Sequence, residues 1–315
     1  MPPAALSYHP HAPEPQYQLH ARLTRFNLAR LQPSLLNADW QDELKAEESL
    51  RFDEGHFVER ERLRIMPMVT DVPTDASAFL HWFEGLRETG PGQKDPLFPW
   101  LASHATLAQM RWFLTQEAAG EAGFDDLVAL TQIGFPVRAK LEMARNYWDE
   151  MGRGHERGMH GLMLKAVVRE LYLDPSPATT VWESLSLANL MVALAVNRRY
   201  AYHAVGALGV IEMTAPGRVA QVNEGLKRLD VPASARTYFQ LHAGLDVKHS
   251  RAWNDEVIFS IVEAHPEAAL PIAEGALMRL AAGARCFRRY RENFNLDDGL
   301  ESSAPRAQVE RASIP

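Results

Sequence analysis

The chain has 315 residues, of which 46% are hydrophobic, and a formal net charge of −7 at pH 7. This composition is typical of a globular protein with a large core, and the acidic balance argues against nucleic acid as the main partner because phosphate binding needs a basic surface. The single cysteine, Cys286, excludes a disulfide framework and a thiolate metal cluster, so any metal would be held by His, Asp and Glu.

The hydrophobic pattern predicts helices along almost the whole chain. Residues 1–16 are rich in proline, show no signal-peptide pattern and are expected to be disordered. Apolar residues at helical spacing then predict helices at 17–32, 39–62, 75–88, 105–119, 123–131, 136–151, 158–172, 181–213, 216–228, 234–264 and 267–293. We predict an all-α protein with a helical extension at 17–62, a main domain at 63–293 and a polar tail at 294–315.

The most apolar stretch, 184–214, predicts a buried core helix. It is interrupted by polar residues, namely Asn189, Asn197, Arg198, Arg199 and His203, and this favours a core helix over a membrane span. We therefore expect a cytoplasmic protein with no membrane and no nucleic-acid partner. Leu and Phe side chains on one face of the 17–62 extension could form a homodimer interface.

The strongest local signal is the segment YFQLHAGLDVKHSRAW at 238–253. His242, Asp246 and His249 stand at positions i, i+4 and i+7, so on an α-helix they project from one face. Two imidazoles and a carboxylate on one face can form half of a dimetal site. A solvated polar stripe, or histidines hydrogen-bonded in the core, is the alternative.

A second signal is NYWDEMGRGHERGMHGLM at 146–163. Glu150 ends one predicted helix and His160 begins the next, across a turn that contains Gly152 and Gly154. The turn would let both side chains face one point. The alternative is a helix that ends at Gly152 with Glu150 exposed.

Two glutamates in apolar surroundings complete the set. Glu117 follows MRWFLTQ, and Glu212 lies in GALGVIEMTAPG. A buried carboxylate must be paired, protonated or metal-bound. Glu121, one turn after Glu117, competes for its role, and Glu117 on a solvent-facing side is the alternative. Together these candidates describe a carboxylate-bridged dimetal site in a helical bundle.

The segments WFLTQEAAGEAGFDDLVAL, NYWDEMGRGHERGMH, GALGVIE and HAGLDVKH resemble the haem-oxygenase-like diiron oxidases, a family of iron-containing redox enzymes. The resemblance covers about residues 100–290 and implies a haem-oxygenase-like bundle of about seven core helices, without haem. It implies metal ligands at Glu117, His160, Glu212, His242, Asp246 and His249, with Glu212 bridging the two metals. Glu150, ten residues before His160, resembles the extra carboxylate ligand, with a catalytic role, of the N-oxygenating branch.

That branch implies an enzyme with two Fe(II) ions that uses O2 and an external electron donor. The expected substrate is a small amine or amidine of the arginine, lysine or 2-aminoimidazole type, converted to an N-hydroxy or nitro product. For substrate binding we consider Arg198, Arg199 and Tyr202. The alternative role of the two arginines is to cap the bundle and pair with surface acids. A desaturase or C–C lyase acting on an amino or fatty acid is the second hypothesis, and a metal-free adaptor or hydrolase is the third.

Overall fold

Helices make up nearly all of the described structure. The computed structural model describes residues 15–33, 35, 39–121 and 123–296, apart from the side chains of Asp246 and Val247. The helices are α1 (Pro15–Leu31), α2 (Trp40–Ile65), α3 (Ala76–Thr89), α4 (Leu97–Ser103), α5 (Leu107–Gly120), α6 (Phe124–Thr131), α7 (Val137–Glu150), α8 (His160–Glu170), α9 (Trp182–Val196), α10 (Ala201–Arg228), α11 (Ala233–Ala252), α12 (Phe259–Ala264) and α13 (Ala269–Phe294). No β-strand occurs among the described residues, which confirms the predicted all-α fold. Most of the predicted disordered N-terminus and polar tail lies outside these residues.

Local capping explains where several helices begin. Asp39 and Asp75 each accept a hydrogen bond from a backbone N–H in the first turn of α2 and α3. Thr106 and Gln109 form a reciprocal capping box at the start of α5. These side chains satisfy N–H groups that have no partner within the helix, so the sequence itself fixes these boundaries.

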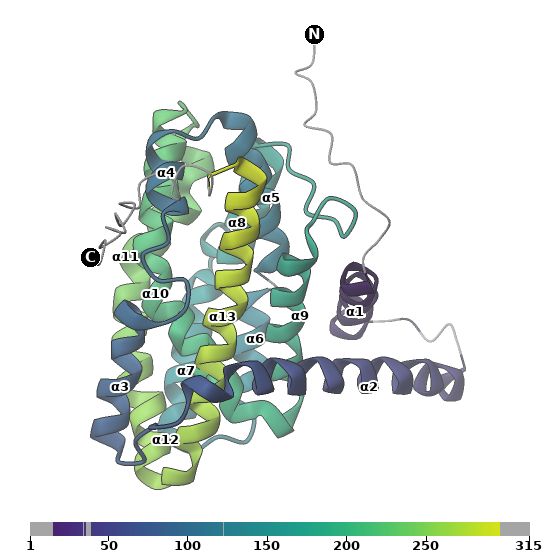
Figure 1. Ribbon diagram of the computed structural model, residues 1–315, viewed down its shortest axis with the longest axis vertical. Helices are drawn as coiled ribbons and strands as arrows, with labels where there is room; N and C mark the ends of the chain where they lie inside the picture. The colour runs from purple at the N-terminus through teal and green to yellow at the C-terminus, as the bar shows by residue number, and fades with distance from the viewer. Residues whose placement is uncertain (1–14, 34, 36–38, 122, 297–315) are drawn as a thin grey trace, which may run out of the picture.

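The centre of the bundle is formed by α9, α10 and α13 (Figure 1). In α9, 13 of the 15 residues are buried, as expected for a helix that is apolar on all sides. A Cβ on Gly206 of α10 would lie 1.9 Å from the carbonyl oxygen of Ile272, so glycine allows α10 and α13 to touch through their backbones. Helix α11 packs on both α10 and α8, and the segments that carry the predicted ligands therefore meet on one side of the bundle.

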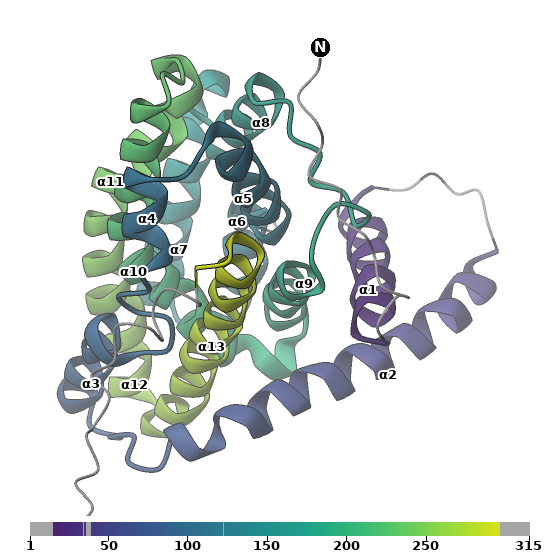
Figure 2. The ribbon, with the colours of Figure 1, turned by 45° about the horizontal axis from the view of Figure 1, so that its top comes forward.

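The N-terminal extension packs on the bundle only in part. Helix α1 lies against α9, and the C-terminal part of α2 contacts α13. The other end of α2 extends away from the bundle (Figures 1 and 2). Trp40, Leu44 and Phe52 on this helix are 64%, 55% and 64% exposed. The homodimer interface expected for this extension stays a prediction.

Several helices differ from the sequence prediction. The predicted helix 234–264 is divided into α11 and α12, with a π-helix at Trp253–Ile258 between them. The predicted helix 181–213 is divided between α9 and α10, because Asn197 has an extended backbone (φ −91°, ψ 111°) and its side chain bonds to Glu54. The break predicted at Pro216 does not occur, and α10 runs through it. Packing of α10 on α11 and α13 outweighs the cost of a proline inside a helix, about 3 kcal/mol. The short helix α4 was not predicted.

None of the described helices combines the length and the apolar character needed to cross a membrane. The cytoplasmic location stays a prediction.

Candidate metal centre

The turn between α7 and α8 positions the first two candidate ligands. Glu150 is the last residue of α7, and His160 is the first of α8. Between them the backbone takes positive φ at Gly152 (61°), Arg153 (53°) and Gly154 (83°). A Cβ on Gly152 would lie 2.3 Å from the carbonyl carbon of Gly158, so this position requires glycine for its φ and for its space. The tight turn directs both ligands inward, and both are 4% exposed.

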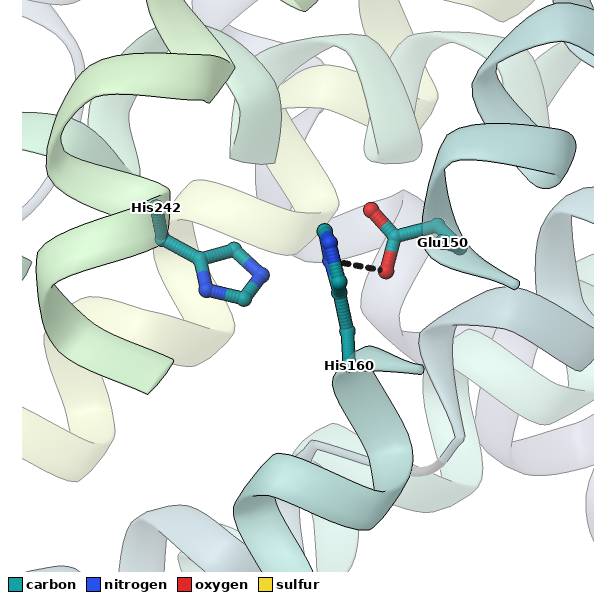
Figure 3. Close-up of side chains that lie close together, drawn as sticks. All are labelled: Glu150, His160 and His242. Atoms are coloured by element: carbon teal, nitrogen blue, oxygen red, sulfur yellow. Dashed lines mark ion pairs between the residues drawn. The ribbon is translucent and has the colours of Figure 1, made fainter. Parts of the chain in front are cut away.

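The first ligand group consists of Glu150, His160 and His242. One ligand atom from each lies within 4.8 Å of the others. His160 Nδ1 lies 2.6 Å from Glu150 Oε2, and the rings of His160 and His242 lie 4.6 Å apart, edge to face. In Figure 3 the His160 ring lies between the Glu150 carboxylate and His242. Three different helices thus bring one carboxylate and two imidazoles together.

The second ligand group consists of Glu150, Glu212 and His249, which meet the same 4.8 Å limit and are all buried. His249 Nδ1 lies 3.7 Å from Glu212 Oε2. Glu150 is the residue common to both groups, so the geometry places this carboxylate between them. The bridging role that the sequence analysis expects for Glu212 stays a prediction.

Hydrogen bonds outside the ligand groups orient three of the ligands. Asn146 Nδ2 donates to Glu212 Oε1 at 2.7 Å. His242 Nδ1 donates to the carbonyl oxygen of Tyr238 at 2.7 Å, so its other nitrogen is free to bind a metal. His249 Nε2 lies 3.1 Å from the Asp149 carboxylate, which leaves its Nδ1 for a metal. Such outer partners fix the tautomer and orientation of ligands in metal sites, and the sequence analysis had not identified Asn146 or Asp149.

The charges of the ligand groups are poorly balanced without a cation. Burial, and then the Glu212 carboxylate, raise the pKa of Glu150 to about 9. Burial lowers the pKa of His242 to about 4. Burial also opposes protonation of His249, but Glu212, Asp149 and Glu150 together raise its pKa to about 9. Carboxylates that repel one another in a buried site favour either protons or metal cations.

Two imidazole nitrogens that face carboxylates without a well-formed hydrogen bond support the metal alternative. His160 Nδ1 and His249 Nδ1 are buried and have no hydrogen-bond partner in suitable geometry. A buried polar atom without a partner is costly. A cation bound by these nitrogens and by the Glu150 and Glu212 carboxylates would remove that cost. The donor set of nitrogen and oxygen atoms suits iron, manganese or zinc, so the residues present fit iron.

The remaining predicted ligands are less closely associated with these groups. Glu117 belongs to neither group, and its carboxylate accepts a hydrogen bond from Tyr290 Oη at 3.1 Å. Glu121 is closer, because its charge influences the pKa of Glu150, and it accepts hydrogen bonds from the backbone N–H groups that begin α6. Asp246 lies on α11 together with His242 and His249, but its side chain is outside the described part of the structure.

The three residues considered for substrate binding lie elsewhere. Arg198 donates to the carbonyl oxygens of Leu130 and Thr131 at the end of α6. Arg199 is exposed and pairs with Glu59, while Tyr202 packs edge to face on Phe135. None of the three lines either cavity beside the candidate ligands, and their contacts are those of the capping alternative.

Those cavities adjoin one another. One, of about 100 Å³, is lined by Glu150, Glu212 and His242. The other, of about 160 Å³, is lined mainly by apolar side chains together with Glu117, Arg218 and Arg279. Seven residues line both, namely Gly120, Glu121, Ile211, Ala215, Val219, Tyr238 and Arg279. The ligand groups are therefore next to a space that a small molecule can enter.

Comparison with known proteins agrees with this geometry. The sequence pattern of a family described as iron-containing redox enzymes matches residues 111–284, which is more than half of the chain and includes all the candidate ligands. The chain belongs to this family of iron-containing redox enzymes and is an oxidoreductase. No match to the chain is found among curated proteins.

Proposed function

We propose that the protein is a diiron N-oxygenase that converts a small amine or amidine to an N-hydroxy product. The single observation that carries the proposal is the inward position of Glu150, which belongs to both ligand groups. By the family resemblance, this additional carboxylate is associated with oxygenation at nitrogen. The local sequence pattern left Glu150 with an exposed alternative, and its 4% exposure argues against that alternative.

The protein's own residues would hold two metal ions. His160 and His242 would bind one, Glu212 and His249 would bind the other, and Glu150 would contact both. Iron bound there would supply redox chemistry and open coordination positions for O2, with the electrons coming from an external donor. Asn146 orients Glu212, and Asp149 orients His249, so the ligand positions are fixed before metal binds.

The overall reaction consumes an external two-electron donor. R–NH2, O2, two protons and two electrons give R–NHOH and water, so an N–O bond forms and the O–O bond breaks. The nitrogen must arrive neutral, because a protonated amine has no lone pair to form that bond. The apolar lining of the adjoining cavity, including Phe113, Leu114 and Leu187, disfavours charged ammonium and excludes water from the reacting nitrogen.

The test is an assay of the iron-loaded protein with arginine, lysine and 2-aminoimidazole, a chemical reductant and ¹⁸O2. A product heavier than the substrate by one ¹⁸O atom on nitrogen supports the proposal. A desaturated or cleaved product from an amino or fatty acid would replace it with the C–H-cleaving hypothesis.

Two matched variants test the residue that carries the proposal. Glu150→Ala should retain less than two irons per chain and lose nearly all N-oxygenation. Glu142→Ala removes another buried glutamate of α7, one that pairs with Arg145. This variant should retain the iron content and the N-oxygenation activity of the wild type. Full activity of Glu150→Ala would remove the basis for assigning oxygenation to nitrogen.

A further inference from the structure

Two arginines in the cavity beside the ligand groups have no role in the proposed metal site. Arg218 comes from α10 and Arg279 from α13, and both line the cavity of about 160 Å³. Arg279 also lines the cavity that contains Glu150 and Glu212. It therefore lies at the boundary between the space for a substrate and the metal ligands.

The positive charge of these arginines is only partly compensated. Glu117 is the one carboxylate of the cavity lining that influences the pKa of both arginines, and it is hydrogen-bonded to Tyr290. Asp95 also acts on Arg218, but it already pairs with Arg291. Glu121, the other acid of the lining, bonds to backbone N–H groups. Among the described residues neither arginine forms an ion pair within 4.0 Å, and Arg279 Nε is buried without a partner. One positive charge is therefore left over.

Arg218 is held in a fixed orientation. Its guanidinium lies over the rings of Phe287, at 5.3 Å, and Phe98, at 5.8 Å, and it donates to Thr214 Oγ1 at 3.0 Å. Burial, and then the charge of Arg279, lower its pKa to about 10, so it remains a cation at neutral pH. A cation that is positioned but only partly compensated is costly to bury, and a bound anion would offset that cost.

We propose that Arg218 and Arg279 bind a carboxylate of the substrate, while its nitrogen faces the metal ligands. A guanidinium forms paired, charge-assisted hydrogen bonds with a carboxylate. The apolar side chains between the two ends suit a short hydrocarbon chain. The substrate class is then an amino acid or another small amino-carboxylate, held by its acid group. The placement of the nitrogen rests on the proposed function, but the carboxylate site does not.

The experiment uses the iron-loaded full chain without O2 and three matched pairs of probes. Each pair differs in the carboxylate: lysine and cadaverine, arginine and agmatine, hexanoate and hexanamide. Thermal unfolding is measured for the wild type, for Arg279→Met and for the surface control Arg198→Met, and iron content is checked in each. At least one carboxylate should raise the wild-type midpoint more than its partner, and Arg279→Met should remove that difference.

A second measurement needs no ligand. Because Arg279 forms no ion pair within 4.0 Å among the described residues and its Nε is buried without a partner, Arg279→Met should raise the unfolding midpoint of the ligand-free protein by about 2–4 °C or more. If an amino-carboxylate is turned over, its KM should rise at least about 30-fold in this variant. A lower midpoint in ligand-free Arg279→Met, or equal effects of both members of every pair on the wild type, would overturn the proposal.

The outcomes also separate this proposal from the N-oxygenase assignment. Selective binding of a carboxylate without any N-oxygenated product would retain the carboxylate site and reject the proposed reaction. Equal N-oxygenation of lysine and cadaverine would retain the reaction and reject the carboxylate site.

Discussion

The bundle contains two buried clusters of histidine and carboxylate, and they differ in how their charges are balanced. In the first, Glu274 on α13 lies 2.7 Å from His203 Nε2 and accepts hydrogen bonds from Arg62 at 2.9 and 3.1 Å. Burial alone would raise the pKa of Glu274, but these partners lower it to about 2. Glu274 there faces a fixed cation, which also pairs with the more exposed Glu59, and the cluster joins three helices.

The second cluster contains the candidate metal ligands. Glu150 and Glu212 are both buried there, and no Lys or Arg pairs with either among the described residues. The pKa of Glu150 is therefore raised to about 9, where that of Glu274 is lowered to about 2. The same residue types thus form a structural cross-link around Glu274, where Arg62 supplies positive charge, and a candidate cation site around Glu150, where no Lys or Arg of the described residues does so. Fixed positive charge distinguishes the two, and the predictions below test that distinction.

The largest expected effect comes from exchanging one histidine of each cluster for alanine. His249→Ala should weaken iron binding by at least about 100-fold, because it removes a direct ligand and even outer partners contribute 10–100-fold. His203→Ala should retain the iron of the wild type but lower the free energy of unfolding by about 3 kcal/mol, because it removes one partner from a buried pair. Elemental analysis and thermal unfolding of both variants measure the two effects. Iron loss in His203→Ala would contradict the division into two clusters.

The next effect is the acid sensitivity of the Glu274 cluster. Its folded-state pKa of about 2 lies below the ordinary value of 4.5, so its contribution to stability is present above pH 4.5 and is lost as pH falls towards 2. The shift corresponds to about 3 kcal/mol. Glu274→Gln should lose that amount at pH 7 and show a weaker decrease between pH 4.5 and 2, measured by urea unfolding at several pH values. If the free energy of unfolding of Glu274→Gln decreases with pH as steeply as that of the wild type, the acid sensitivity arises from other groups.

A smaller effect is expected from the turn that places Glu150. Gly152→Ala should lower stability by about 2 kcal/mol, because alanine is strained at φ 61° and its Cβ would overlap Gly158. It should also lower iron content, since the turn directs Glu150 and His160 inward. Gly55→Ala is the control, because its Cβ would meet nothing within 4 Å and a helical alanine is favourable by up to about 1 kcal/mol. Unfolding curves and iron analysis of both variants provide the comparison.

The sequence was sufficient to predict the helical fold and to bring several candidate ligands together, although metal binding by them stays a prediction. Helical periodicity placed His242 and His249 on one face, and the glycine turn suggested that Glu150 and His160 meet. Periodicity and turns are local properties, which explains these successes. The contacts of Asn146 and Asp149 depend on how α7 packs against α10 and α11, so no local pattern could reveal them.

The arginines of the cavity were missed for a different reason. Arg218 follows Pro216 and Gly217, where the sequence predicts a break between two helices. The helix instead continues, and tertiary packing directs Arg218 into the interior. Arg279 belongs to a helix with several other arginines, and the sequence does not indicate which of them is buried. The positions of buried charges are set by packing between helices that are distant in sequence.

The smallest predicted effect concerns Asn146, the neutral partner that orients Glu212. Asn146→Ala removes the 2.7 Å hydrogen bond to Glu212 Oε1 but leaves every candidate ligand in place. We expect about 10-fold weaker iron binding, near the lower limit for outer partners of metal ligands, measured by competition with a chelator. Asn197→Ala is a matched control. Asn197 Nδ2 donates to a Glu54 carboxylate oxygen at 2.9 Å, and neither residue belongs to the ligand groups, so this variant should bind iron as the wild type does. If the two variants bind iron equally well, Glu212 is positioned by packing alone. The candidate metal ligands would then resemble the Glu274 cluster, whose side chains are held by one another.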